Sequence, residues 1–264
     1  MQLLTCCLQG WRRAAGEVSL PQGNQVREAV VSKGSATVES RMEVARGFED
    51  EAVAAERAFA IRVAYDGIPA AFLSVLAEDS VICGEGPESG RPAYEALPKD
   101  YPGRLLWEPR AVAASPDGTL AFTAGPYRSL DVRGREKGRG VYFSVWRRNL
   151  DSGLLELVLD FGAKGAAFPG LDAGLKRLQV PEPAAGGEAL KKWVETGQVP
   201  TLEGALRLGD PSSPLKPLGF FQSQDRSLGA LWGARTRSDG SLGGFVILLG
   251  LSDPQPIPLA CIFA

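Results

Sequence analysis

Histidine is absent from this 264-residue chain, and its absence removes several classes of chemistry at once. Without imidazole there is no Ser-His-Asp or Cys-His nucleophile system, no histidine–carboxylate dyad and no histidine-ligated metal. Any catalysis therefore has to use carboxylate, Tyr, Lys, Arg or Cys side chains. We expect neither a metal ion nor any other cofactor.

Cysteine is scarce, and its spacing does not fit zinc binding or thioredoxin-like chemistry. The four cysteines are Cys6, Cys7, Cys83 and Cys261, with no CxxC pair among them. Adjacent cysteines seldom bridge to each other, and the last two fall in expected strands. We interpret Cys83 and Cys261 as small core residues rather than as a disulfide.

Long apolar runs are also missing. The run Phe245–Leu249 is far too short to span a bilayer. The N-terminal MQLLTCCLQGWRR has too short an apolar stretch for a signal peptide, and its charges follow that stretch instead of preceding it. We expect a cytoplasmic protein by default. The faint lipobox likeness of LLTC at 3–6 leaves a periplasmic or lipid-anchored form open.

Excess charge of either sign is lacking as well. The formal net charge is −2, which gives no general attraction to phosphate backbones, so we expect neither nucleic acid nor a membrane as a partner. What remains is an ordinary globular composition, 44% hydrophobic and 23% charged. The length allows one large or two small domains.

Two segments show weak periodicity. Residues 1–47 are rich in Gly, Ser and Gln, and we predict an N-terminal arm there, either disordered or loosely docked, with a short helix near Val26–Val31. Residues 164–187 are predicted to be a linker with one short helix at Leu171–Leu178. The ordered pattern lies between these segments, in residues 48–163, and after them, in residues 188–264.

The pattern of residues 48–163 predicts helices followed by strands. The helix Glu49–Tyr65 has one apolar stripe that includes Phe59 and Val63, and Pro69 opens a second helix that contains Phe72 and Leu76. Further elements are expected at a turn Glu78–Ser80, a strand Val81–Cys83, one or two helical turns Pro92–Leu97, and strands near 104–114, 119–128, 140–148 and 154–161. Ser115-Pro-Asp-Gly118 is predicted to be a hairpin turn because Pro sets φ and Gly tolerates positive φ.

Four motifs in this order resemble the nuclear transport factor 2-like superfamily, and within it the SnoaL-like branch of unknown function. They are AERAFA (55–60), AAFLSVLAEDSVI (70–82), LLWEPRAVAASPDGTLAFTAGPYRS (105–129) and GVYFSVWRRNLDSGLLELVLDFG (140–162). The resemblance implies an α+β fold in which a cone-like curved antiparallel sheet and N-terminal helices enclose a pocket. It implies no reaction, because the superfamily contains isomerases, dehydratases, transport factors and assembly domains.

Residues 188–264 are predicted to be a truncated second copy of the same fold. The segments 109–128 and 217–236 align without gaps, and Glu188-Ala-Leu190 matches Glu95-Ala-Leu97. The strands of the second copy are apolar on both faces, so we expect the two sheets to pack together as an intrachain pseudo-dimer. This interpretation predicts a monomer, with a homodimer as the alternative.

Asp160 is the candidate catalytic residue because it interrupts an otherwise apolar strand. In a pocket, desolvation raises the pKa of a carboxyl group and suits it to acid–base work with Tyr142 or Tyr127, by analogy with ketosteroid isomerase of the same superfamily. A structural or solvent-facing carboxylate is the alternative. The resemblance places six aromatic residues near the pocket and one arginine at its mouth, where it could hold an anion: Phe59, Phe72, Trp107, Tyr127, Tyr142, Trp146 and Arg91.

Three hypotheses of function follow. The first is a protein that binds a small, largely apolar ligand in the cone of the first domain. The second is a scaffold or interaction protein whose cone is filled by its own side chains. The third is a metal-independent isomerase, lyase or hydrolase that uses Asp160. The sequence favours the first and leans away from an enzyme.

Overall fold

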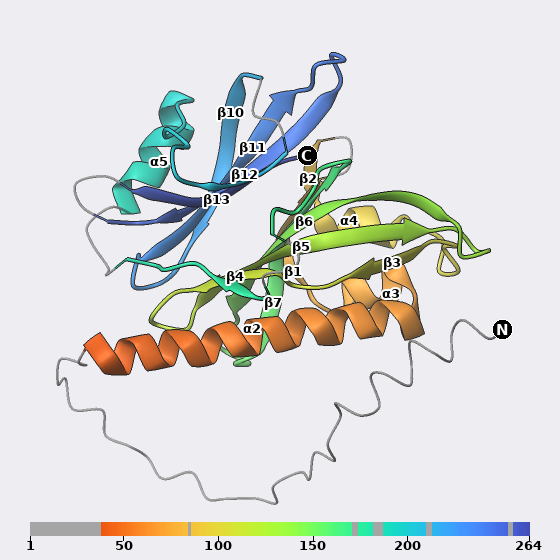
Figure 1. The fold of residues 1–264 in the computed structure, drawn as a ribbon, viewed down its shortest axis with the longest axis horizontal. Helices are drawn as coiled ribbons and strands as arrows, with labels where there is room; N and C mark the ends of the chain where they lie inside the picture. The colour runs from red at the N-terminus through yellow and green to blue at the C-terminus, as the bar shows by residue number, and fades with distance from the viewer. Residues whose placement is uncertain (1–37, 84–85, 171–173, 182–186, 210–212, 253–255) are drawn as a thin grey trace, which may run out of the picture. The chain divides into compact units, whose positions relative to one another are not determined.

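The computed structural model describes residues 38–83, 86–170, 174–181, 187–209, 213–252 and 256–264. The predicted short helix near Val26–Val31 lies outside these residues. Figure 1 shows two β-sheets in the described chain; one long and two short helices lie beside the first sheet, and a further helix lies beside the second. None of the described helices combines the length and the apolar character that a bilayer crossing requires.

Helix α2 (Val38–Asp66) covers one face of the first sheet. Phe59 and Val63 are buried, as the predicted stripe requires, and Phe48, which lies outside the predicted helix, is buried as well. The helix begins at Val38 and not at Glu49, so the prediction that residues 38–47 belong to an arm was wrong. Once a helix is nucleated, each further residue adds a hydrogen bond, so the helix continues upstream of its packed part.

Helix α3 (Ile68–Leu73) follows after Gly67, whose φ of 83° ends α2. Pro69 lies in its first turn, as predicted. Leu76 does not belong to this helix, because it opens strand β1 (Leu76–Cys83). The predicted turn at Glu78–Ser80 was also wrong: these residues lie within β1, where a register shift between Leu76 and Val81 accommodates them.

The first sheet has the strand order β2-β1-β7-β6-β5-β4-β8, and β3 pairs with β5 beside this path. Strand β1 is parallel to β7, β8 is parallel to β4, and the other pairs are antiparallel. The remaining elements of this part are β2 (Pro87–Ser89), α4 (Gly90–Glu95), β3 (Arg104–Trp107), β4 (Ala111–Ala114), β5 (Leu120–Leu130), β6 (Glu136–Arg148), β7 (Leu155–Lys164) and β8 (Lys176–Arg177).

The predicted hairpin turn Ser115–Gly118 is confirmed. Gly118 has a φ of 72°, and the Ser115 hydroxyl accepts hydrogen bonds from the backbone N–H groups of Thr119 and Leu120. The predicted helix Leu171–Leu178 was wrong at Lys176–Arg177, which form strand β8, and residues 171–173 lie outside the described residues. Backbone pairing with β4 holds this segment extended.

The second sheet follows helix α5 (Gly187–Thr196) and has the strand order β10-β11-β12-β13-β9, in which β9 and β13 are parallel. Its strands are β9 (Leu206–Leu208), β10 (Leu215–Gln222), β11 (Leu228–Thr236), β12 (Leu242–Gly250) and β13 (Ile257–Phe263). This succession repeats β4-β5-β6-β7-β1 of the first sheet. Descent of the second sheet from a tandem copy stays a prediction.

The repeated strand order corrects one detail of the sequence alignment. Helix α5 precedes β9, the strand parallel to the last strand of its sheet, whereas α4 follows β1, the corresponding strand of the first sheet. The match between Glu188-Ala-Leu190 and Glu95-Ala-Leu97 therefore pairs elements that do not correspond in the fold. By its place in the order, α5 corresponds to the helices before β1.

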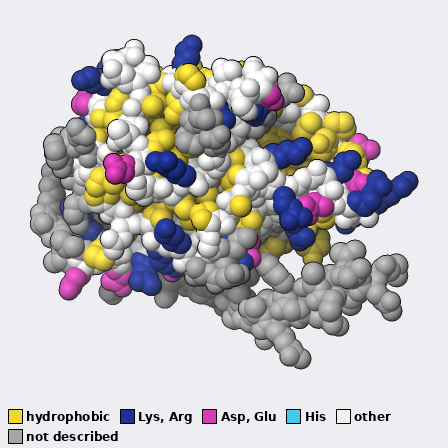
Figure 2. All heavy atoms as spheres, turned by 45° about the horizontal axis from the view of Figure 1, so that its top comes forward, with side chains coloured by type: hydrophobic (Ala, Val, Ile, Leu, Met, Phe, Trp, Pro, Cys, Tyr) yellow, Lys and Arg dark blue, Asp and Glu magenta, His cyan; other side chains and the backbone are white. Residues whose placement is uncertain are grey.

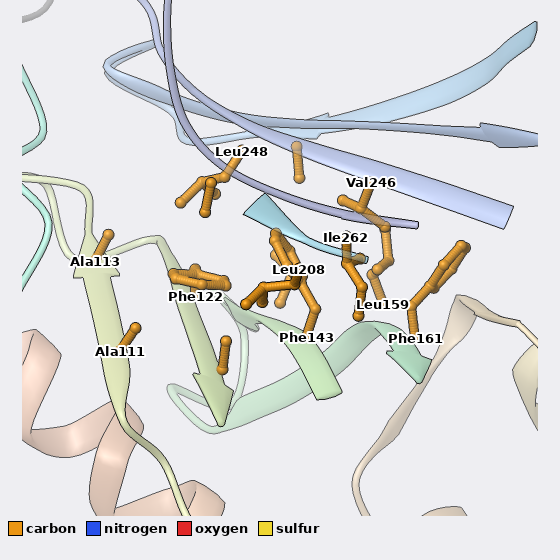
Figure 3. Close-up of a cluster of buried hydrophobic side chains, with 14 of the residues drawn as sticks. Ala111, Ala113, Phe122, Phe143, Leu159, Phe161, Leu208, Val246, Leu248 and Ile262 are labelled. Atoms are coloured by element: carbon orange, nitrogen blue, oxygen red, sulfur yellow. The ribbon is translucent and has the colours of Figure 1, made fainter. Parts of the chain in front are cut away.

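The two sheets share one hydrophobic core. Figure 3 shows Phe122, Phe143 and Leu159 of the first sheet facing Val246 and Leu248 of the second. The turns after β4 and β10 also meet, because the backbone N–H of Asp225 donates to the Asp117 carboxylate at 2.7 Å and that of Gln224 donates to the Thr119 hydroxyl at 3.0 Å. Both faces of the first sheet are thus covered, which explains why β6 is buried without interruption from Val141 to Trp146.

We predict that the chain is a monomer, since the apolar faces of the two sheets already cover each other. Light scattering of the purified protein should give a mass near 28.0 kDa. A mass twice as large would favour the homodimer alternative.

Candidate functional site

A cavity of about 290 Å³ lies between the helices and the face of the first sheet that turns away from the second sheet. Its wall is mainly aromatic, and two acidic side chains, Glu56 and Asp160, also line it. The aromatic residues of the wall are Phe59, Phe72, Tyr94, Trp107, Tyr127, Tyr142 and Phe161. A concave apolar site with few polar groups is the usual form of a small-molecule pocket.

Five of these rings form a continuous wall. Tyr94 stacks on Phe72 with ring centroids 4.1 Å apart, and Phe72 meets Phe59 edge to face at 4.7 Å. Phe59 then meets Trp107 at 5.1 Å, and Trp107 meets Tyr142 at 6.4 Å. Each contact joins different elements, from α4 through α3 and α2 to the sheet, so the wall also ties the helices to the strands.

Strand register places the polar residues of the site together. Along β6, Tyr142, Ser144 and Trp146 point to the cavity side, because alternate residues of a strand share a face. Ser144 is paired with Thr123 of β5 on one side and with Asp160 of β7 on the other. Three neighbouring strands therefore present a row of polar side chains beneath α2.

Glu56 of α2 lies over this row and is 1% exposed. Its carboxylate accepts three hydrogen bonds, from Trp107 Nε1 at 2.6 Å, Thr123 Oγ1 at 2.6 Å and Trp146 Nε1 at 2.8 Å. Burial raises the pKa of Glu56, and these donors oppose the rise without cancelling it.

The sequence interpretation missed Glu56, although a signal was present. Glu56 follows Ala52 by four residues and precedes Phe59 by three, so it occupies the apolar stripe of the helix. An acid on the buried stripe of an amphipathic helix needs partners in the core.

Asp160 accepts a hydrogen bond from Ser144 Oγ at 3.0 Å through one carboxyl oxygen. Among the described residues, its other oxygen has no hydrogen-bond partner. Burial, assisted by the nearby charge of Glu56, raises the pKa of Asp160 to about 7. At neutral pH this carboxyl group can therefore either donate or accept a proton.

The Tyr142 hydroxyl is buried in the cavity wall and makes no hydrogen bond of ordinary geometry to the described residues. It faces Thr123, whose own hydroxyl donates to Glu56. Burial raises the pKa of Tyr142 well above its usual value, so the hydroxyl stays protonated. Buried polar groups are nearly always paired, and an unpaired one in a cavity wall suits a polar atom of a ligand.

Most of the predicted site residues lie together. The cavity is lined by Asp160, Phe59, Phe72, Trp107, Tyr127 and Tyr142. Trp146 does not line it: its ring is fully buried behind the wall, where the indole N–H holds Glu56. Trp146 therefore contributes to the site indirectly, because it fixes the position of the Glu56 carboxylate from within the core.

Arg91 does not line the cavity either, and its prediction as a ligand contact was wrong. Its guanidinium donates to the backbone carbonyls of Leu73 and Leu76 and pairs with Glu78 at 3.2 Å. The last carbonyls of a helix lack partners within the helix, and Arg91 supplies one for the end of α3. Among the described residues there is no cluster of three potential metal ligands.

Comparison with known proteins gives a likeness in fold only. No protein-family model matches the chain, and no curated protein matches it. A nuclear transport factor 2-like superfamily protein from Salmonella enterica serovar Typhimurium is 14% identical, with a TM-score of 0.37 over 49% of this chain and 98% of that one.

Two further solved structures are similar in the same way. A putative scytalone dehydratase from Novosphingobium aromaticivorans is 11% identical, with a TM-score of 0.36 over 48% of this chain and 88% of that one. A putative polyketide cyclase from Xanthomonas campestris is 16% identical, with a TM-score of 0.33 over 44% and 90%. In each of these comparisons the similarity extends over about half of this chain or slightly less.

Proposed function

We propose that the chain binds a small, largely apolar organic molecule in the cavity of the first sheet. The observation that carries this proposal is the aromatic-walled space of about 290 Å³ toward which Asp160 and the unpaired Tyr142 hydroxyl converge. Apolar walls supply affinity, and the few polar groups fix the orientation of the ligand. The scaffold hypothesis requires a cone filled by its own side chains, which this space argues against.

A second candidate function is metal-independent acid–base catalysis. It is favoured by the pKa of Asp160, about 7, because proton transfer is most efficient when the pKa lies near the working pH. Tyr142 would hydrogen-bond the oxygen of a substrate. Cys83 also lines the cavity, but burial raises its pKa to about 11, so its thiol stays protonated and is a poor nucleophile.

Gly162 gives a test of binding, because it lies in the cavity wall. A Cβ added there would lie 3.6 Å from the Tyr127 ring, an ordinary contact, so a valine can grow into the cavity. We expect compounds from a panel of small aromatic and alicyclic molecules to raise the melting temperature of the native protein. A ligand at 100 times its dissociation constant adds about 2.7 kcal/mol of stability.

The variant Gly162→Val should lose this response because its side chain occupies the cavity. Gly47→Val is the matched control, since no atom lies within 4 Å of an added Cβ on the exposed side of α2. It should respond to the panel as the native protein does. If the same compounds stabilise Gly162→Val and the native protein equally, they bind outside this cavity.

Isotope exchange tests the catalytic candidate. If Asp160 transfers protons, a bound cyclic ketone in heavy water should take up deuterium next to its carbonyl, and NMR would detect it. The variant Asp160→Asn should abolish that exchange. If the native protein binds the ketone but the ketone exchanges no faster than it does in buffer alone, the catalytic candidate is rejected and binding remains the function.

A further inference from the structure

We infer that the ligand of this cavity is an organic cation, a protonated amine or a quaternary ammonium ion, held between the aromatic wall and Asp160. This inference deepens the proposed function and rests on it. It concerns the charge of the ligand, which neither the fold nor an apolar cavity determines by itself.

The first argument is the charge of the lining. Among the described residues, the cavity is lined by the carboxyl groups of Glu56 and Asp160 and by no lysine or arginine. The arginine expected at the mouth, Arg91, is bound to Leu73, Leu76 and Glu78 instead. An anionic ligand would thus meet like charge without compensation, whereas a cation would offset the buried acid.

The second argument is the density of aromatic rings. A cation near the face of Trp, Tyr or Phe is attracted by the ring quadrupole, and cages of such rings are how proteins bind quaternary ammonium groups. Five contiguous rings form the wall, and Trp107 is at its centre. The Trp107 N–H donates to the Glu56 carboxylate at 2.6 Å, which polarises the indole and makes its ring more attractive to a cation.

The third argument is independent of charge. The Tyr142 hydroxyl is more than nine-tenths buried, lines the cavity and is unpaired among the described residues. One oxygen of Asp160 is also without a hydrogen bond there. These two oxygen atoms can accept the N–H groups of an ammonium ion, while the rings contact its carbon atoms.

The geometry implies a pH dependence. A cation favours the ionised form of Asp160, whose pKa is about 7, so cation affinity should rise about tenfold between pH 6 and pH 8 and then level off. The other titratable groups of the wall do not oppose this rise in cation affinity. The pKa values of Tyr94, Tyr127, Tyr142 and Cys83 are raised, so these groups stay neutral, and that of Glu56 is raised, which acts in the same direction as Asp160.

Phenyltrimethylammonium and its uncharged carbon isostere, tert-butylbenzene, test the inference, with benzoate as the anionic probe. The ammonium charge of the first probe is fixed, so any pH dependence comes from the protein. Binding is measured at pH 6 and pH 8 by calorimetry on the full chain. We expect the cation to bind at least tenfold more tightly than its isostere at pH 8, to gain about tenfold between the two pH values, and benzoate not to bind.

Variants locate the effect. Asp160→Asn should remove both the preference for the cation and its pH dependence, while Asp151→Asn, the same change in an exposed turn, should keep both. Tyr127→Leu removes one ring from the wall and replaces no carboxyl group, and it should weaken cation binding severalfold more than it weakens tert-butylbenzene binding. Benzylamine distinguishes a protonated amine from a quaternary ammonium ion, because only the former has N–H groups to donate. Tyr142→Phe removes an acceptor of these N–H groups, so it should weaken the binding of benzylamine more than that of phenyltrimethylammonium.

Two outcomes would overturn the inference. Equal and pH-independent binding of the cation and its isostere would reject the preference for a cation and leave the binding function standing. Binding of benzoate in preference to both would reject it as well. Failure of the proposed function itself is distinguishable, because then neither these probes nor the wider panel would stabilise the native protein.

Discussion

Replacement of Glu56 by alanine is expected to lower the free energy of unfolding by about 4 kcal/mol. The carboxylate accepts hydrogen bonds from Trp107, Thr123 and Trp146, three side chains from three different strands. Alanine leaves these donors without an acceptor, and each buried unsatisfied donor costs about 1–3 kcal/mol. Part of this cost is recovered because alanine also removes a carboxylate whose burial is unfavourable, as the raised pKa of Glu56 indicates.

The measurement is urea denaturation at pH 7, followed by tryptophan fluorescence. Glu56→Gln should lose about half as much stability, because the amide keeps one acceptor oxygen but turns its NH₂ toward the donors. Glu43→Ala is the control: it makes the same change at an exposed position of the same helix and should alter stability by less than about 0.5 kcal/mol. Equal effects of Glu56→Ala and Glu43→Ala would show that the three hydrogen bonds do not hold the helix to the sheet.

Replacement of Asp160 by asparagine is expected to have the opposite effect and to stabilise the protein at pH 8 by up to about 4 kcal/mol. The pKa of this group rises from 3.8 to about 7 on folding. Between these two values the folded state holds a proton that the unfolded state has lost, so the contribution of this group to stability is greatest below pH 4, falls between pH 4 and pH 7, and levels off above pH 7. Asparagine is neutral throughout and removes this loss.

Denaturation at pH 4.5 and pH 8 measures the effect. The gain in Asp160→Asn over the native protein should be small at pH 4.5 and large at pH 8, and Ser144 can still donate to the amide oxygen. Asp151→Asn makes the same substitution in an exposed turn and is the control. A gain of the same size at both pH values would mean that Asp160 is not the group whose titration destabilises the protein.

The sequence by itself determined most of the local elements. The apolar stripe of α2, the turn Ser115–Gly118 and the strand pattern predict the observed helix-then-sheet order because each rests on contacts or φ values within a few residues. The placement of Asp160 and Trp107 in one cavity also agrees with the structure. The resemblance to the nuclear transport factor 2-like fold supplied that pairing.

Only the tertiary structure decided which polar groups meet. Glu56 and Trp146 are 90 positions apart, and their hydrogen bond depends on how α2 crosses the sheet. Arg91 was assigned to a ligand because it follows the loop expected at the mouth of the cone, but its guanidinium donates to a backbone carbonyl at the end of α3. Pairing partners depend on strand register and helix packing, which join residues across the chain, whereas sequence periodicity reports only which face of an element is buried.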